Sequence, residues 1–164
     1  MAERPDDGRH HELIDGTEIV TPTPAPGHQS AAFALARLLD DAKPPGLAVL
    51  MAPVDWRVDG TTVVQPDVLV VDEADLDGKF LARTPHLVVE VTSPSTAMAD
   101  RTIKWALYER AGVPAYWLFE PEVPRLMVLE RDGAHLVELM TLTGDEQAEL
   151  AAPFALTVSP AKLG

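Results

Sequence analysis

The stretch Leu87-Val88-Val89-Glu90-Val91 decides the fold, because it sets one acid inside an otherwise unbroken run of strand-forming apolar residues. A short apolar run without polar alternation predicts a strand that is buried on both faces. An ionised carboxylate inside such a strand costs on the order of several kcal/mol unless a partner or a cation meets it. Glu90 therefore indicates either a functional centre or a buried salt bridge, for which Lys104 and Arg101 are the candidate partners.

A second apolar strand, Pro66-Asp67-Val68-Leu69-Val70-Val71, precedes this one and opens on an acid. Adjacent strands would bring Asp67 and Glu90 together, and two close carboxylates repel unless one is protonated or a divalent cation lies between them. Carboxylate oxygens suit Mg²⁺, and the backbone carbonyl of Val91 is a candidate for a further ligand. The alternative for Asp67 is an Asx turn at the start of the strand.

Helical spacing follows from Ala97 to Ala111, and Gly112 supplies a stop. Within this helix Asp100, Lys104 and Tyr108 lie at steps of four and form one stripe. Lys104 could face the carboxylates and stabilise charge on a phosphoryl group. The alternative is an exposed ion pair with Asp100 one turn away, of little energetic value.

The remaining periodicity predicts few helices and many strands. The expected elements are a hairpin at 11–20, a helix at about 28–41, strands at 47–58 and 61–65, a mobile loop at 72–85 that is a candidate lid, a strand at 115–120, a hairpin formed by 125–130 and 134–142, and a last strand at 154–158. This order indicates an α/β (α+β) protein, in which helices flank a mixed sheet with additional β-hairpins.

Composition limits the class of protein. A length of 164 residues favours a single domain over 1–164, with 1–10 as a flexible tail. No apolar stretch is long enough to span a membrane, and the polar start lacks an apolar signal region, so we expect a cytoplasmic protein. The chain has no cysteine, which excludes thiolate sites and favours Mg²⁺ or Mn²⁺ on oxygen ligands. A net charge of -13 argues against broad, non-specific affinity for nucleic acid.

Several common catalytic motifs are absent from the sequence. It contains no GxGxxG, GxxxxGK[ST], GxSxG or HExxH pattern, so dinucleotide, P-loop, serine hydrolase and zincin functions have no support. The remaining polar candidates have structural explanations: His10 and His11 as exposed residues of a polar terminus, His28 at a helix start, His86 at a strand start, and Ser93 and Ser95 in a turn and helix N-cap. Tyr108, Tyr116 and Trp117 are expected to pack in the core rather than stack on bases.

Taken in order, these residues resemble the Uma-two family of restriction-endonuclease-like proteins, within the PD-(D/E)XK nuclease superfamily. The resemblance spans roughly residues 12 to 130 and rests on Glu12-Leu13-Ile14-Asp15-Gly16, Pro66-Asp67-Val68, Val89-Glu90-Val91, Ser93-Pro94-Ser95-Thr96, Asp100, Lys104, Tyr108, Gly112-Val113 and Tyr116-Trp117.

This resemblance implies a restriction-endonuclease-like fold and a metal site. Asp67 and Glu90 resemble the two acidic metal ligands of the superfamily, and Glu12 the extra acid that many members place near the metal. The superfamily lysine normally stands two residues after the second acid, where this chain has Thr92. The family pattern implies that Lys104 takes over that role from the helix. Glu120 stands where the family often has Asp.

The sequence thus predicts a Mg²⁺-dependent endonuclease that hydrolyses phosphodiester bonds in DNA, with Asp67 and Glu90 as ligands and Lys104 assisting. By analogy with nucleases that cut both strands, a homodimer is expected. Two alternatives stay open: a non-catalytic nuclease-fold module that binds or regulates protein partners, and a metal-dependent hydrolase of a small phosphorylated substrate.

Overall fold

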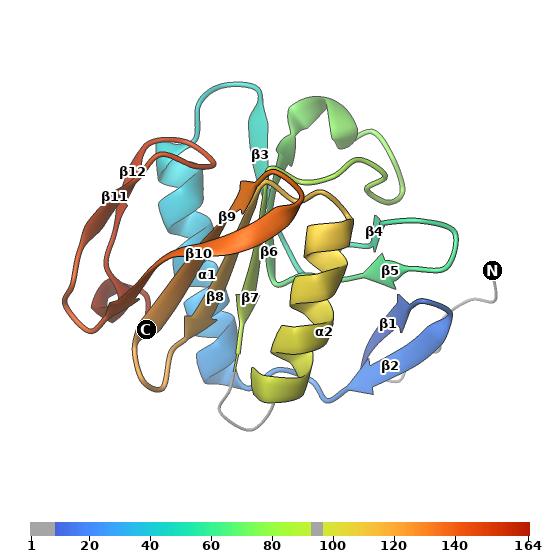
Figure 1. Ribbon diagram of the computed structural model, residues 1–164, viewed down its shortest axis with the longest axis horizontal. Helices are drawn as coiled ribbons and strands as arrows, with labels where there is room; N and C mark the ends of the chain where they lie inside the picture. The colour runs from blue at the N-terminus through green and yellow to red at the C-terminus, as the bar shows by residue number, and fades with distance from the viewer. Residues whose placement is uncertain (1–8, 93–96) are drawn as a thin grey trace.

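A six-stranded mixed sheet forms the centre of the computed structural model, which describes residues 9–92 and 97–164 (Figure 1). The strand order is β10-β9-β8-β7-β6-β3. β7 and β8 run parallel, and the other neighbouring pairs of this sheet are antiparallel. The strands are β3 (Leu47–Met51), β6 (Val68–Asp72), β7 (Leu87–Val91), β8 (Ala115–Glu120), β9 (Arg125–Asp132) and β10 (His135–Thr143).

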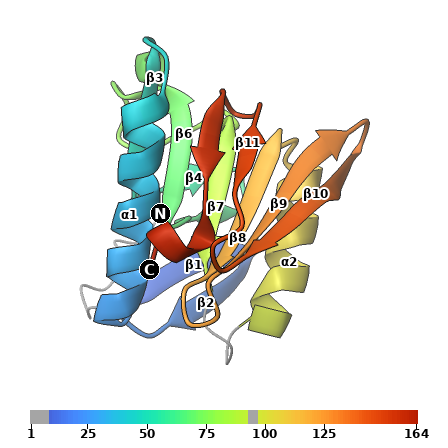
Figure 2. The same cartoon turned by 90° about the vertical axis from the view of Figure 1, so that its left-hand side faces the viewer.

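The two α-helices cover opposite faces of this sheet (Figure 2). α1 (Pro26–Ala42) packs with the face that includes Leu87 and Val89, and α2 (Ala97–Arg110) packs with the face that includes Val88. Successive side chains of a strand point to opposite faces, so an apolar run such as β7 can fill both cores at once. The same alternation puts Glu90 on the α2 face.

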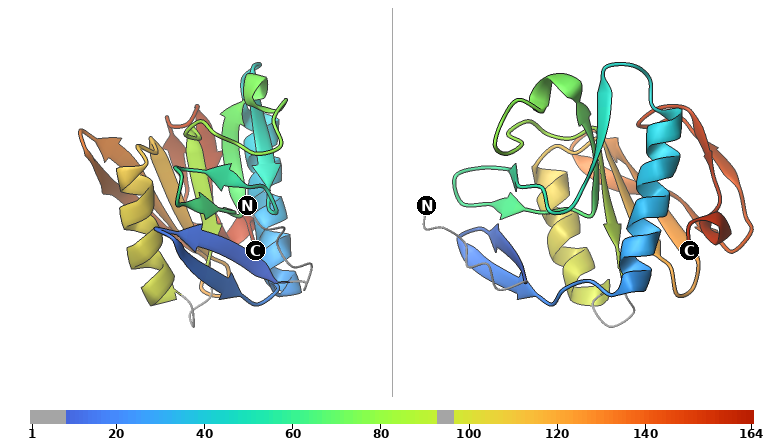
Figure 3. Two further views of the ribbon diagram at one scale, coloured as in Figure 1. Left: turned by 90° about the vertical axis from the view of Figure 1, so that its right-hand side faces the viewer. Right: turned by 180° about the vertical axis from the view of Figure 1, so that it is seen from behind.

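A smaller sheet lies beside α2, in the order β2-β1-β5-β4 (Figure 3). Its strands are β1 (His10–Ile14), β2 (Thr17–Thr21), β4 (Trp56–Arg57) and β5 (Val63–Val64). The β1–β2 hairpin turns through Asp15 and Gly16, whose φ angles of 49° and 80° match the turn expected from an Asp-Gly pair.

A third, two-stranded sheet packs on the α1 side and consists of β11 (Ala148–Leu150) and β12 (Leu156–Val158). Two 3-10 turns complete the elements, η1 (Glu73–Asp75) and η2 (Pro160–Lys162).

The predicted fold class is confirmed, since a mixed sheet is flanked by helices and accompanied by hairpins. The hairpin predicted around Asp59-Gly60 is present, since β4 and β5 pair antiparallel, but residues 58–62 connect the strands instead of two residues. The prediction of one unbroken strand over 47–58 is wrong. β3 ends at Met51 just before Pro53, which cannot donate to a ladder, and the chain then changes sheets. α1 starts at Pro26 rather than near 28, because proline is well placed in a first helical turn. β11 had not been predicted.

None of the helices in the described ranges is long and apolar enough to cross a membrane. Of the tail expected at 1–10, residues 1–8 lie outside the described residues, and β1 already begins at His10.

Candidate functional site

Asp67 and Glu90 lie side by side on neighbouring strands. Val68 of β6 pairs with Val89 of β7 in the antiparallel register, so the next residue outward on each strand is Asp67 and Glu90 respectively. Both side chains are largely buried, with residue exposures of 9% and 6%. The juxtaposition expected from the two strands is therefore present.

Lys104 of α2 reaches into the same place. Its Nζ lies 2.9 Å from Oε1 of Glu90 and 3.1 Å from Oε1 of Glu12, which β1 supplies from the smaller sheet. Oε1 of Glu12 also accepts a hydrogen bond from the backbone N–H of Gln65 at 2.8 Å. One ammonium thus joins the central sheet to the smaller one through two carboxylates. The salt bridge anticipated between Glu90 and Lys104 is present, within a cluster that contains further acids.

Tyr108, one turn further along α2, fixes the orientation of Glu90. Its hydroxyl donates to Oε1 of Glu90 at 2.5 Å, and its ring stacks on Trp56 and meets Tyr116 edge-on. Tyr108, Tyr116 and Trp117 are fully buried, which confirms the expectation of core packing. The stripe at steps of four predicted that Tyr108 shares a face with Lys104, but the hydrogen bond to Glu90 was missed.

Asp67 is held by two different donors. The backbone N–H of Val91 donates to its Oδ2 at 2.7 Å, and Nε2 of His28 lies 3.2 Å from the same oxygen. His28 stands in the first turn of α1, and the opposite Nδ1 of its ring is buried without a hydrogen-bond partner among the described residues. Sequence reasoning assigned His28 only a place at a helix start, because no local spacing links it to Asp67.

The protonation of this cluster follows from its burial and charge balance. Burial raises the pKa of Glu90 to about 8; Lys104 opposes this rise, while the carboxylates of Asp67 and Glu12 add to it. Burial disfavours the charge of Lys104, but Glu90 and Glu12 outweigh burial and raise the pKa of the ammonium. Three carboxylates face one lysine, so the cluster retains a proton at neutral pH while the ammonium stays charged.

The hydrogen bond to Asp67 is the main cause that raises the pKa of His28, and burial opposes it. At slightly acidic pH the imidazole therefore adds a second positive charge beside Asp67.

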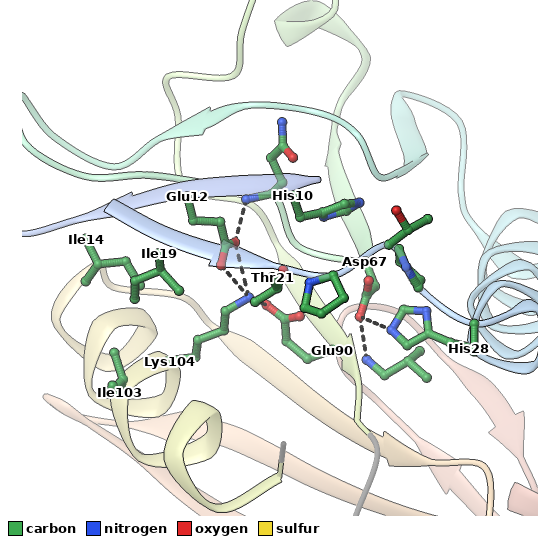
Figure 4. A pocket seen from close by; sticks show the side chains of 16 residues that line it. His10, Glu12, Ile14, Ile19, Thr21, His28, Asp67, Glu90, Ile103 and Lys104 are labelled. Atoms are coloured by element: carbon green, nitrogen blue, oxygen red, sulfur yellow. Dashed lines mark hydrogen bonds and ion pairs between the residues drawn. The ribbon is translucent and has the colours of Figure 1, made fainter. Parts of the chain in front are cut away.

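A cavity of about 290 Å³ opens onto these side chains (Figure 4). Its polar wall includes Glu12, Asp67, Glu90, Lys104 and His28, and its apolar wall includes Ile14, Ile19 and Ile103. Glu12, Glu90 and Lys104 point toward one another, while Asp67 points toward His28 (Figure 4). Polar groups that converge at one side of a cavity, with shifted pKa values, are typical of binding and catalytic sites.

The candidate ligands for a divalent cation are Asp67 and Glu90. Within the described part of the chain, no group of three or more His, Asp or Glu side chains is spaced to hold a metal ion. Mg²⁺, however, usually keeps several waters and needs only one or two carboxylates. Asp67 and Glu90 are two such carboxylates on neighbouring strands.

The other residues considered in the sequence analysis do not contribute to this cluster or lie outside the described residues. Thr92 is buried with its backbone N–H bonded to Phe119, and no cation comes from this position. Ser93 and Ser95 lie outside the described residues, as does the side chain of Asp100. His11 is not exposed as expected: it is 8% exposed and its Nδ1 lies 2.9 Å from Glu18.

Comparisons with known proteins agree with this architecture. The family model Uma2, described as "Putative restriction endonuclease", matches residues 2–161. Among solved structures, a protein from Anabaena variabilis ATCC 29413 described as "a putative nuclease belonging to DUF820" matches with a TM-score of 0.74 and 19% identity. The match covers 93% of this chain and 88% of that one, and it shows a shared fold. A search of curated proteins found no match.

Proposed function

The chain belongs to the Uma2 family, and from this premise we propose that it is a divalent-metal-dependent endonuclease of the PD-(D/E)XK type that hydrolyses DNA. The observation that carries the proposal is the juxtaposition of Asp67 and Glu90 with Lys104 at the floor of a cavity. Two strand-end acids and one lysine are the three components that a metal-assisted phosphodiester site needs.

Asp67, Glu90 and the backbone carbonyl of Val91 are the groups that would hold Mg²⁺ or Mn²⁺, with Glu12 as an additional acid. When bound, the metal would polarise the scissile phosphate and lower the pKa of an attacking water. The excess of carboxylate charge supports a cation here, since Glu90 otherwise retains a proton to a pH of about 8.

Lys104 is the residue we assign to the charge that develops on the phosphoryl oxygens. Its Nζ already contacts two carboxylates, 2.9 Å from Glu90 and 3.1 Å from Glu12, which keep it protonated and in place. A fixed ammonium that needs no reorganisation stabilises a transition-state charge more than a mobile one. In this proposal Lys104 supplies from α2 the cation that the superfamily normally takes from the position of Thr92.

Three further groups keep the acids in position. Tyr108 donates to Glu90, while His28 and the N–H of Val91 hold one oxygen of Asp67. These contacts involve one oxygen of each carboxylate, Oε1 of Glu90 and Oδ2 of Asp67, so the second oxygen of each is available to a ligand. Tyr108 also favours the ionised form of Glu90, which a metal requires.

We propose a homodimer as the form that cuts duplex DNA, because two strands require two sites related by symmetry. Size-exclusion chromatography with light scattering, with and without a DNA duplex, tests this assignment. A species of one chain mass in both conditions contradicts it.

A nicking assay on supercoiled plasmid tests the proposed activity. We expect nicks with Mg²⁺ and none with EDTA, and we expect Asp67→Asn and Glu90→Gln to abolish nicking while the proteins remain folded. Absence of nicking by the wild-type chain under all divalent metals would favour the non-catalytic module. Hydrolysis of a small phosphodiester without nicking would favour the small-substrate hydrolase.

A further inference from the structure

Two arginines meet on one acid beyond the site described above. Glu120, the last residue of β8, contacts Arg101 of α2 through Nη2 and Arg125 of β9 through Nε at 3.1 Å and Nη2 at 2.6 Å. The Glu120 side chain is 8% exposed. We call Arg101, Glu120 and Arg125 the arginine pair with its acid.

This group lies at the same end of the sheet as the candidate site. β7 and β8 are parallel neighbours, and Glu90 pairs in register with Leu118, so Glu120 stands on the same face two residues further out. Strand geometry puts the two acids about 8 Å apart at their Cα atoms. Along α2, Arg101 precedes Lys104 by three residues and shares its side of the helix.

The arginine pair has a surplus of charge and of donors. Two guanidinium groups face one carboxylate, which leaves a net charge of about +1. Each guanidinium has about five N–H donors, and Glu120 accepts from only a few of them. Nε of Arg101 is buried and has no hydrogen-bond partner in the described ranges. The side chains remain accessible, with exposures of 22% for Arg101 and 38% for Arg125.

A DNA strand placed with its scissile phosphate at Lys104 would extend past this group. A separation of about 8 Å corresponds to roughly one to two nucleotide steps. Guanidinium groups match phosphate oxygens through paired hydrogen bonds, and phosphate contacts fix the register of the strand.

We propose that Arg101 and Arg125, held together by Glu120, bind a backbone phosphate that flanks the scissile phosphate of the DNA substrate. This inference rests on the proposed function. It gives the acidic chain a local positive group beside the site at which the substrate approaches the carboxylates.

The competing explanation is that the three residues only pin α2 to the turn between β8 and β9. That role predicts a loss of stability on mutation with no effect on DNA affinity. The sign of the Glu120→Gln effect separates the two roles, because removal of the acid frees both arginines for phosphate.

The test measures the affinity for a fluorescent DNA duplex at several salt concentrations, with Ca²⁺ as an oxygen-binding cation, for the wild type and four variants. We expect Arg101→Gln and Arg125→Gln each to weaken binding by about tenfold and to lower the salt slope by about one. We expect Glu120→Gln to tighten binding. The control Arg83→Gln removes an exposed arginine paired with Asp75, before the opposite end of β7, and should bind as the wild type does.

Every outcome decides between the possibilities. Unchanged affinity and slope in both arginine variants, or no DNA binding by the wild type, overturns the inference. The expected changes in binding without any Mg²⁺-dependent nicking retain the phosphate site and remove the nuclease. Nicking by the wild type, together with unaltered DNA binding in the arginine variants, retains the nuclease and removes the phosphate site. If Arg101→Gln or Arg125→Gln unfolds below the assay temperature, the sign of the Glu120→Gln effect decides; if Glu120→Gln unfolds, the affinity and salt slope of the two arginine variants decide.

Discussion

Lys104 is the residue on which the proposed catalytic role depends. Thr92, just after β7, offers no cation to the acids, while the ammonium of Lys104 comes from α2 and lies 2.9 Å from Glu90. The spacing of four residues predicted that Lys104 and Tyr108 share one face of the helix. The antiparallel register of β6 and β7 places Asp67 beside Glu90. His28 could not be predicted, because its contact with Asp67 depends on how α1 packs against the sheet.

The first prediction concerns the affinity for Mg²⁺. Glu90 must lose its proton to act as a ligand, so the affinity should rise as the pH increases toward about 8 and level off above it. Asp67→Asn and Glu90→Gln should bind no Mg²⁺, because each keeps the shape of the side chain and removes its charge. Titration calorimetry at several pH values measures both effects, and unchanged Mg²⁺ affinity in the two variants would remove the metal assignment.

The raised pKa of Glu90 also makes a contribution to stability that depends on pH. The folded protein binds the Glu90 proton more tightly than the unfolded chain, whose ordinary pKa is 4.5. This contribution is therefore complete below pH 4.5 and is lost as the pH rises through about 8. Glu90→Gln should lack this part of the pH dependence, and chemical unfolding at pH 5 and pH 8.5 in EDTA compares the two proteins.

The second prediction concerns Lys104→Met. The substitution leaves Glu12 and Glu90 buried without their ammonium, so we expect a loss of about 3 kcal/mol of unfolding free energy in EDTA, partly restored by Mg²⁺. Turnover should fall by about 10², the usual loss for one electrostatic contact in the transition state. Lys79→Met, at an exposed lysine, is the matched control. Wild-type turnover in folded Lys104→Met would show that the lysine is only a salt-bridge partner.

At the scale of elements, the site depends on two helices that approach the sheet from opposite faces. α1 brings His28 to Asp67, and α2 brings Lys104 and Tyr108 to Glu90. The 3.6-residue period predicted both helices, and the apolar runs predicted β6 and β7. The break after β3 was missed because the apolar pattern continues past Pro53 while the chain moves to another sheet.

The third prediction tests the anchoring of α1. Leu35 is fully buried in the core between α1 and the sheet, so Leu35→Ala should cost about 3 kcal/mol of unfolding free energy through lost burial and a cavity. Phe33 lies on the same helix but is 60% exposed, and Phe33→Ala should change stability by no more than about 0.5 kcal/mol. Urea unfolding of both variants measures the difference. Equal losses would contradict the assigned packing face.

At the scale of the whole molecule, two apolar cores share one central sheet. The core on the α1 side and the core on the α2 side are built from alternate residues of the same strands, so neither can form without the other. Chain length predicted one domain, and this shared sheet supports keeping it as a proposal, because the strands that hold the site also divide the cores. The smaller sheet could not be placed from sequence, since its strands β1 and β5 pair across a long separation in the chain.

The fourth prediction follows from this shared sheet. We propose that the chain unfolds as a single cooperative domain, with one calorimetric transition whose enthalpy equals the van't Hoff value. Near-ultraviolet circular dichroism, which reports the buried tryptophans Trp56 and Trp117, should follow the same curve as far-ultraviolet circular dichroism. Two separated transitions would contradict a single domain.

The most direct test of the metal centre is the position of a bound cation. Crystals of the wild-type protein soaked in Mn²⁺ should give an anomalous difference peak within about 2.2 Å of an oxygen of Asp67 and an oxygen of Glu90. Glu90→Gln crystals treated in the same way should lack that peak. A Mn²⁺ peak elsewhere, with Lys104 still bridging Glu12 and Glu90 and no density between Asp67 and Glu90, would contradict the account.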